Sequence, residues 1–137
     1  MSEIIEVNAG KVLTTITVKD SGGITVGAMR VNLFDVRLVS RLQEIAEFLR
    51  SFRPTGNGIE RMMAMDVALE DKFCYLLGYD CRAELFGVLS PTSILPDGEM
   101  YTIRILQTIE ENFADEIKER AEARAAVLDK YLQRYQK

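Results

Sequence analysis

The chain has 137 residues, of which 47% are hydrophobic and 28% are charged, the composition of one ordinary globular domain. It contains no histidine, which excludes Ser-His-Asp triads, Cys-His pairs and every zinc site that needs a histidine ligand. The net charge of -4, without a basic run, disfavours nucleic acid and anionic membranes as partners.

Residues 1–34 predict an antiparallel β-hairpin. β-Branched residues alternate over residues 12–18, turn-forming residues occupy 20–23, and a second β-rich run follows over 24–33. Residues 4–7 predict a short third strand, so the sheet is expected to have two or three strands. Because an isolated hairpin is only marginally stable in water, one of its faces must pack on helices.

Residues 35–52 predict the first helix. Asp35 is expected as its N-cap, since a short carboxylate accepts hydrogen bonds from the free amides of the first turn. Apolar side chains then recur every three or four residues and predict an inner stripe. The stripe consists of Leu38, Leu42, Ile45, Leu49 and Phe52. A proline- and glycine-containing link over 54–58 ends the helix.

The second helix is predicted over residues 59–77, with Gly78 as its C-terminal cap. The residues expected on its inner stripe are Met62, Met65, Leu69, Phe73 and Leu76. The methionines at 62, 63 and 65 also suit a surface that grips varied partner helices, because thioether side chains repack at low cost. Two of the three lie on the inner stripe, so core filling is favoured.

A short helix capped by Asp80 and closed by Gly87 is predicted next. Residues 89–98 contain two prolines and an Asp-Gly pair and predict a loop. Ile94 and Leu95 are expected to order this loop, because both are too apolar to be left in water.

Residues 99–136 contain neither proline nor glycine and predict one long helix. At about 1.5 Å per residue it extends nearly 60 Å, well beyond the size of a compact domain of this length. Its first half carries a large apolar stripe and is expected in the core. The second half has few apolar residues among dense charges and is expected to project or to pack on another chain. A break over 112–115 stays open, because Asn and Asp are weak helix formers.

Together these elements predict an α+β, mainly α fold, with an N-terminal antiparallel β-hairpin packed on three to four helices and a long C-terminal helix. Residues 1–137 are expected to form a single domain. Its parts are a β-hairpin region over 1–34, a helical core over 35–113 and a projecting C-terminal helix over 114–137.

The candidate partner or oligomer contacts lie on two helices. Small, leucine and tyrosine positions of the last helix follow spacings of four, three, four and three, which suits a helical seam. These positions are Ala121, Ala125, Leu128, Leu132 and Tyr135. On the first helix Arg37 and Arg41 lie one turn apart and are candidate contacts for an acidic partner, although a helix surface balanced by Glu44 and Glu47 is favoured.

We assign no catalytic, cofactor-binding or metal-binding residue. Acids cluster over 110–122 but lack metal-ligand spacing, so a solvated acidic face is favoured. Cys74 and Cys81 lack CxxC spacing and are interpreted as two reduced thiols of an intracellular protein. No apolar run approaches the roughly 18 residues needed to span a bilayer, so we expect a soluble chain without membrane contact.

The order of the elements is similar to that of one known group of proteins. It consists of a hairpin leading into Leu33, Phe34 and Asp35, an amphipathic helix, a helix ending in Phe73, Leu76, Leu77 and Gly78, a short helix of Glu84, Leu85, Phe86 and Gly87, and a long charged helix. Over roughly residues 24–125 this arrangement resembles the tail assembly chaperone-like proteins of long-tailed phages and prophages of Gram-positive bacteria.

The resemblance implies a non-enzymatic morphogenesis factor that acts in the host cytoplasm. Such a factor keeps the tape-measure protein soluble, helps recruit tail-tube subunits and forms a homo-oligomer. The resemblance assigns no functional residue, because it has no motif that fixes one.

Two alternatives belong to other classes of protein. One is a small acidic phage inhibitor of a host nucleic-acid-binding or defence enzyme, which presents the acids at 110–122 as a phosphate mimic and needs a continuous negative surface. The other is an enzyme that uses carboxylates alone, which needs a deep pocket with two carboxylates facing each other.

Overall fold

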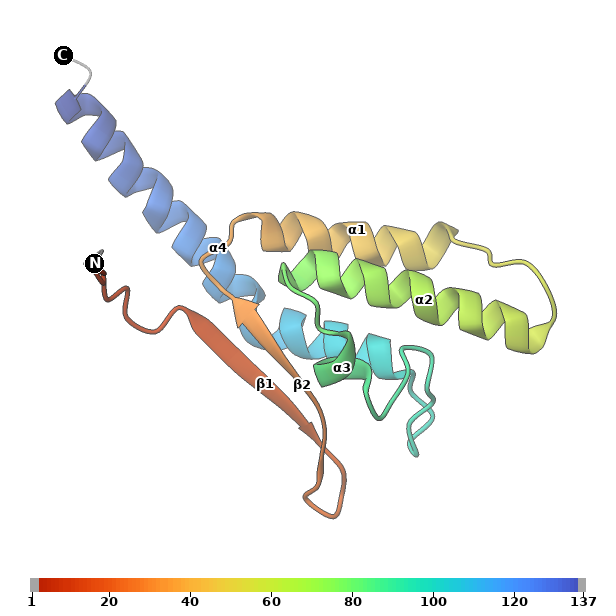
Figure 1. Cartoon of the computed structure of the whole chain (residues 1–137). Coiled ribbons are helices and arrows are strands. Elements are labelled where there is room, and N and C mark those ends of the chain that lie inside the picture. The colour runs from red at the N-terminus through yellow and green to blue at the C-terminus, as the bar shows by residue number, and fades with distance from the viewer. Residues whose placement is uncertain (1–2, 136–137) are drawn as a thin grey trace.

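The computed structural model describes residues 3–135 and has the predicted α+β, mainly helical fold (Figure 1). An antiparallel hairpin precedes four helices, of which the last is by far the longest. The elements are β1 (Leu13–Lys19), β2 (Thr25–Asn32), α1 (Arg37–Ser51), α2 (Gly58–Leu77), α3 (Arg82–Phe86) and α4 (Tyr101–Tyr135).

The hairpin has the predicted pairing. β1 and β2 run antiparallel with Ile16 opposite Met29, and Met29 is fully buried while Ile16 packs against the same core. Asp20 closes the turn, because its Oδ1 accepts hydrogen bonds from the backbone N–H groups of Gly22 (2.8 Å) and Ile24 (3.0 Å). One face of the hairpin therefore covers the helices, as the alternation of residue types predicts.

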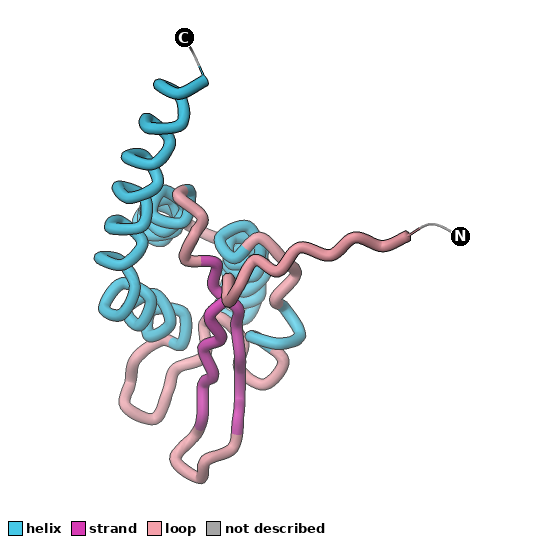
Figure 2. The backbone as a smooth tube through the Cα atoms, turned by 90° about the vertical axis from the view of Figure 1, so that its left-hand side faces the viewer, coloured by secondary structure: helices cyan, strands magenta, loops and turns pink. Residues whose placement is uncertain are grey.

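The predicted third strand over residues 4–7 is wrong. This segment has no strand structure, and its three apolar side chains are almost fully exposed. A turn separates it from β1, since the N–H of Gly10, with a φ of 74°, bonds to Oδ1 of Asn8 (2.8 Å). Figure 2 shows the segment leaving the sheet and running away from it. The sheet of the described chain thus has two strands.

Both predicted aspartate N-caps lie one residue before the actual cap. The N-cap of α1 is Val36 and that of α3 is Cys81, and neither side chain makes a capping bond. Asp35 and Asp80 still accept a hydrogen bond from the backbone N–H two residues later, at 3.0 Å and 3.2 Å. Each carboxylate therefore accepts a hydrogen bond from the first backbone N–H of the following helix, although it lies outside the helix itself.

The termini of α2 follow the sequence closely. Asn57 and Glu60 form a capping box, in which each side chain accepts a bond from the other residue's backbone N–H. Gly78 ends the helix in the left-handed conformation, with a φ of 77°, which a side chain would strain.

The predicted inner stripe of α2 is wrong at the N-terminal end of the helix. Met62 is 53% exposed and Met65 is half-buried, so the buried stripe begins at Leu69. β2 and α3 gather around the second half of α2, while the first half extends past them (Figure 1). Core filling by Met62 fails because its side chain lines an open groove beside Leu49 and Phe52 and is not enclosed.

The loop before α4 is ordered by backbone contacts as well as by Leu95. Ile94 and Met100 form a β-bridge, and the hydroxyl of Thr102 donates to the carbonyl of Pro91 (2.5 Å). Leu95 packs against the core as expected, whereas Ile94 is 66% exposed, contrary to prediction. Neighbouring residues of an extended backbone point to opposite sides, so only one of the two can face inward.

α4 is a continuous helix through residues 112–115, where a break was the open alternative. Figure 1 shows that its two halves nevertheless run in different directions. Thr108 donates to the carbonyl of Arg104 (2.8 Å) and Asn112 donates to that of Thr108 (2.7 Å). Side chains that bond the carbonyl four residues earlier bend helices. We attribute the change of direction to these two bonds.

The core centres on Tyr101 at the start of α4. Its hydroxyl donates to the carbonyl of Leu85 (2.8 Å), and burial raises its pKa to about 12, so the donated proton is retained at neutral pH. The ring meets Phe86 edge to face, and Phe86 meets Phe73 in the same way, with ring centres 5.9 and 5.6 Å apart. Gly27 of β2 lies against the hydroxyl.

The close approach of Gly27 to Tyr101 predicts the effect of adding one methyl group. A Cβ at position 27 would lie 2.3 Å from the Tyr101 hydroxyl and 3.0 Å from the carbonyl of Leu85. We expect Gly27→Ala to lower the free energy of unfolding by about 1–3 kcal/mol, the usual cost of overpacking a core. Urea titration measures this change.

The matched control is Gly58→Ala at the first residue of α2. A Cβ there meets no heavy atom within 4 Å, so the variant should be as stable as the parent or slightly more stable. Equal stability of the Gly27 and Gly58 variants would contradict the packing shown here.

Candidate protein-interaction surface

The last turns of α4 carry an uncovered apolar row, which we name the α4 seam. It consists of Ala121, Ala125, Leu128, Leu132 and Tyr135. Ala121 is half-buried, whereas every residue from 122 to 135 is exposed. The exposed fractions are 53% for Leu128, 40% for Leu132 and 74% for Tyr135. The seam therefore projects beyond the core, and Figure 1 shows this end of α4 standing clear of the other elements.

The seam continues a row that the protein itself buries. Ile117, one turn before Ala121, is 1% exposed and belongs to the core, which reaches this far along the helix. Arg120 makes a further contact with the rest of the chain just before the exposed turns, because its guanidinium lies 4.4 Å from the centre of the Phe34 ring. The same helical face is thus covered by its own chain up to Ile117 and uncovered afterwards.

Two residues beside the seam were missed by the sequence analysis. Val127, which is apolar, and Tyr131, which is aromatic, are each more than half exposed. Tyr131 lies three residues after Leu128 and four before Tyr135, so it shares their face of the helix. The four-residue spacing of Val127 and Tyr131 is visible in the sequence, but the prediction followed only the row of the seam and not the neighbouring row on the helix.

The same turns also carry charges of both signs, with Lys130 on the side opposite to the seam and Glu122 and Asp129 on its flanks. Farther back, within the acidic cluster, Glu116 accepts two hydrogen bonds from Arg120 (3.2 and 2.8 Å). Cations are therefore interleaved with these acids. The inhibitor alternative, which needs a continuous negative surface, stays a hypothesis without a specific observation in its favour.

The two candidate arginines of α1 lie in different environments. Arg37 is exposed over 70% of its side chain and pairs with Asp35 (2.9 Å). Arg41 is exposed over only 13%, donates to the backbone carbonyl of Tyr75 (3.0 Å), and stacks on the Tyr75 ring 4.5 Å from its centre. Its Nε is buried without a hydrogen-bond partner. Arg41 therefore connects α1 to α2, while Arg37 is accessible to a partner.

Asp35 holds both arginines at the start of α1. Its carboxylate is bonded to Arg37 and lies 3.8 Å from Arg41. These contacts, above all the hydrogen bond from the Arg37 side chain, keep the pKa of Asp35 below its ordinary value. The sequence analysis expected Glu44 and Glu47 to balance the charges of Arg37 and Arg41, but Asp35 does so. Glu47 instead pairs with Arg50 (3.1 Å).

A second uncovered apolar area lies on the first half of α2, and we name it the α2 face. It consists of Ile59, Met62, Met63 and Val67, all more than half exposed. Two of its four members are methionines, whose flexible thioethers adapt to different partner shapes. Figure 1 shows that this half of α2 lies at the end of the molecule opposite to the α4 seam.

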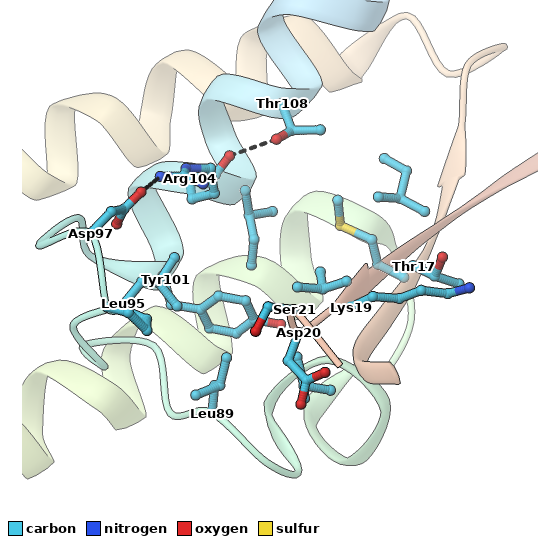
Figure 3. Close-up of a pocket in the computed structure, with 16 residues that line it drawn as sticks. Thr17, Lys19, Asp20, Ser21, Leu89, Leu95, Asp97, Tyr101, Arg104 and Thr108 are labelled. Carbon is cyan, nitrogen blue, oxygen red and sulfur yellow. Dashed lines mark hydrogen bonds and ion pairs between the residues drawn. The ribbon is translucent and has the colours of Figure 1, made fainter. Parts of the chain in front are cut away.

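An apolar cavity of about 680 Å³ lies between the hairpin, the loop before α4 and the first turns of α4 (Figure 3). Its two acidic lining residues are engaged within the chain. Asp97 pairs with Arg104, and Asp20 bonds the amides of its turn. Figure 3 shows Asp20 and Asp97 apart from each other, so this cavity lacks the facing carboxylates that a carboxylate enzyme needs.

Comparison with known protein families, curated proteins and solved structures finds no match. Within residues 3–135, no three His, Cys, Asp or Glu side chains are grouped so as to hold a metal ion. Over that same range, no helix combines the length and the apolar character required to cross a membrane.

The lowered pKa of Asp35 predicts how stability depends on pH. The stabilisation from the ionised carboxylate is fully present above its ordinary pKa of 3.8 and is lost as the pH falls below that value through the lower folded-state pKa. Asp35→Asn should therefore cost about 0.3–1 kcal/mol at pH 7, the usual worth of a favourably placed charge at a helix terminus. This difference should narrow below pH 3.8. Urea titrations between neutral and acidic pH measure it.

Asp129→Asn is the matched control, since Asp129 is exposed on the projecting part of α4. We expect this variant to match the parent at every pH tested. A constant difference between the Asp35 variant and the parent, from neutral to strongly acidic pH, would show that the ion pairs at the start of α1 do not stabilise the fold.

Proposed function

We propose that this protein is a non-enzymatic morphogenesis factor of a long-tailed phage or prophage, similar to the tail assembly chaperones. It binds the tape-measure or tail-tube protein in the host cytoplasm and works as a homo-oligomer. The observation that carries the proposal is the α4 seam, an apolar helical face that continues the core and is left uncovered for its last turns.

The composition of the seam suits a helical client. Leucine and tyrosine side chains at three- and four-residue spacing form a stripe into which the apolar face of another helix can pack. About two heptads of such a stripe are too weak to hold two helices together alone. A partner therefore needs further contacts, and the α2 face offers an apolar area that adapts to different shapes.

The proposal predicts that the seam is required for association. We expect the protein to bind, on co-expression, the tape-measure or tail-tube protein encoded beside it, and its mass in light scattering to rise with concentration. Leu128→Glu combined with Leu132→Glu should weaken binding on the order of 100-fold, since burying each leucine contributes roughly 1.5–3 kcal/mol. Both residues are exposed, so circular dichroism should show an intact fold.

The matched control places the same change of charge on the opposite face of the helix. Lys130→Gln combined with Gln133→Glu alters the net charge by two units, as the leucine pair does, and leaves the seam intact. This variant should bind like the parent. A strict monomer that retains neither tail protein would exclude the proposal, and equal loss of binding in both variants would show that charge, not the seam, controls association.

A further inference from the structure

The two cysteines of the chain lie side by side, although seven residues separate them. Cys74 is in the last turn of α2 and Cys81 is the N-cap of α3, with the cap at Gly78 reversing the chain between them. Their Sγ atoms are 3.9 Å apart and both thiols are free. The sequence alone did not indicate this proximity, because it depends on the turn between the two helices.

The two thiols differ in access. Cys74 is half-buried beside charged groups, and its Sγ lies 3.7 Å from a carboxylate oxygen of Asp80, which in turn pairs with Arg82 (3.0 Å). Cys81 is fully buried and packs within the core cluster. Burial, with a smaller contribution from Cys74, raises the pKa of Cys81 to about 12. Cys74 is therefore the thiol that a solvent reagent meets first.

We propose that Cys74 and Cys81 form a reversible dithiol–disulfide site that reacts with small-molecule disulfides of the glutathione type. The separation of the sulfur atoms supports it, since they must approach by only about 1.9 Å to reach a disulfide bond length of about 2.05 Å. Cys74 is only half-buried, so an oxidant in solvent can reach its sulfur.

The reaction proceeds in two thiol–disulfide exchanges. The Cys74 thiol loses its proton, its sulfur attacks one sulfur of oxidised glutathione, and the other glutathione leaves as a thiolate that takes up a proton. As the Cys81 sulfur then attacks Cys74 Sγ, its thiol proton passes to the sulfur of the second glutathione, which leaves as a thiol. The protein loses two electrons and two protons, and one glutathione disulfide becomes two thiols.

A disulfide between Cys74 and Cys81 would cross-link the turn between α2 and α3, and this turn contacts the hairpin. Tyr79 lies between the two cysteines, and its hydroxyl accepts a hydrogen bond from the backbone N–H of Arg30 in β2 (2.8 Å). The Arg30 guanidinium also stacks on the Tyr79 ring, 4.2 Å from its centre. Oxidation is therefore expected to slow hydrogen exchange at the Arg30 amide, because the turn carrying its partner becomes cross-linked.

Treatment of the reduced full-length protein with oxidised glutathione tests the proposal. After alkylation with N-ethylmaleimide under denaturing conditions, intact mass should show a monomer without glutathione or maleimide adducts, lighter than the reduced chain by two hydrogen atoms. Peptide mapping should link Cys74 to Cys81, and dithiothreitol should restore two alkylatable thiols. Under the same treatment Cys81→Ser should retain one glutathione on Cys74, while Cys74→Ser should stay unmodified in the folded state.

The wild-type chain decides the outcome even where a cysteine variant folds poorly, because its reaction needs no substitution. A lasting glutathione adduct on Cys74 in the wild-type protein would overturn the proposal, since it means that Cys81 cannot reach the mixed disulfide. A disulfide between two chains would overturn it as well. So would full alkylation of both cysteines after a treatment that oxidises a dithiol peptide completely.

Discussion

The hydroxyl of Tyr101 donates a hydrogen bond to the carbonyl of Leu85, and Gly27 packs against both groups. This contact joins three elements that are distant in sequence. It requires Gly27 in β2, the backbone of α3 and the first residue of α4 to meet at one point. Because the hydroxyl is fully buried, its proton needs an acceptor, and the Leu85 carbonyl supplies one. The hairpin, the short helix and the long helix are positioned by this single requirement.

From that point the core follows α4 as far as Ile117 and then stops. The second half of α4 turns away from the hairpin, α1 and α2 (Figure 1), so the apolar row continues into solvent as the α4 seam. A chain of this size that leaves leucines and tyrosines on one face of a projecting helix exposes a surface typical of protein contacts. The proposed function rests on this mismatch between the length of α4 and the extent of the core.

The sequence predicted the parts of the fold that depend on local chemistry. Alternation located the hairpin, and Gly78 marked the C-terminal end of α2. It failed where distant elements decide exposure: Met62 follows the correct period, yet it lines an open groove and not the closed core. The seam was predictable from spacing alone, whereas the burial of Arg41 and the proximity of the cysteines were not, because each depends on how two helices pack.

The bend in α4 determines how the exposed surfaces are arranged. Thr108 and Asn112 each bond the carbonyl one turn earlier, and beyond this point the helix turns away from the body (Figure 1). The α4 seam and the α2 face consequently lie at opposite ends of the molecule. A client that contacts both surfaces, as the proposed function requires, must therefore span the body of the molecule.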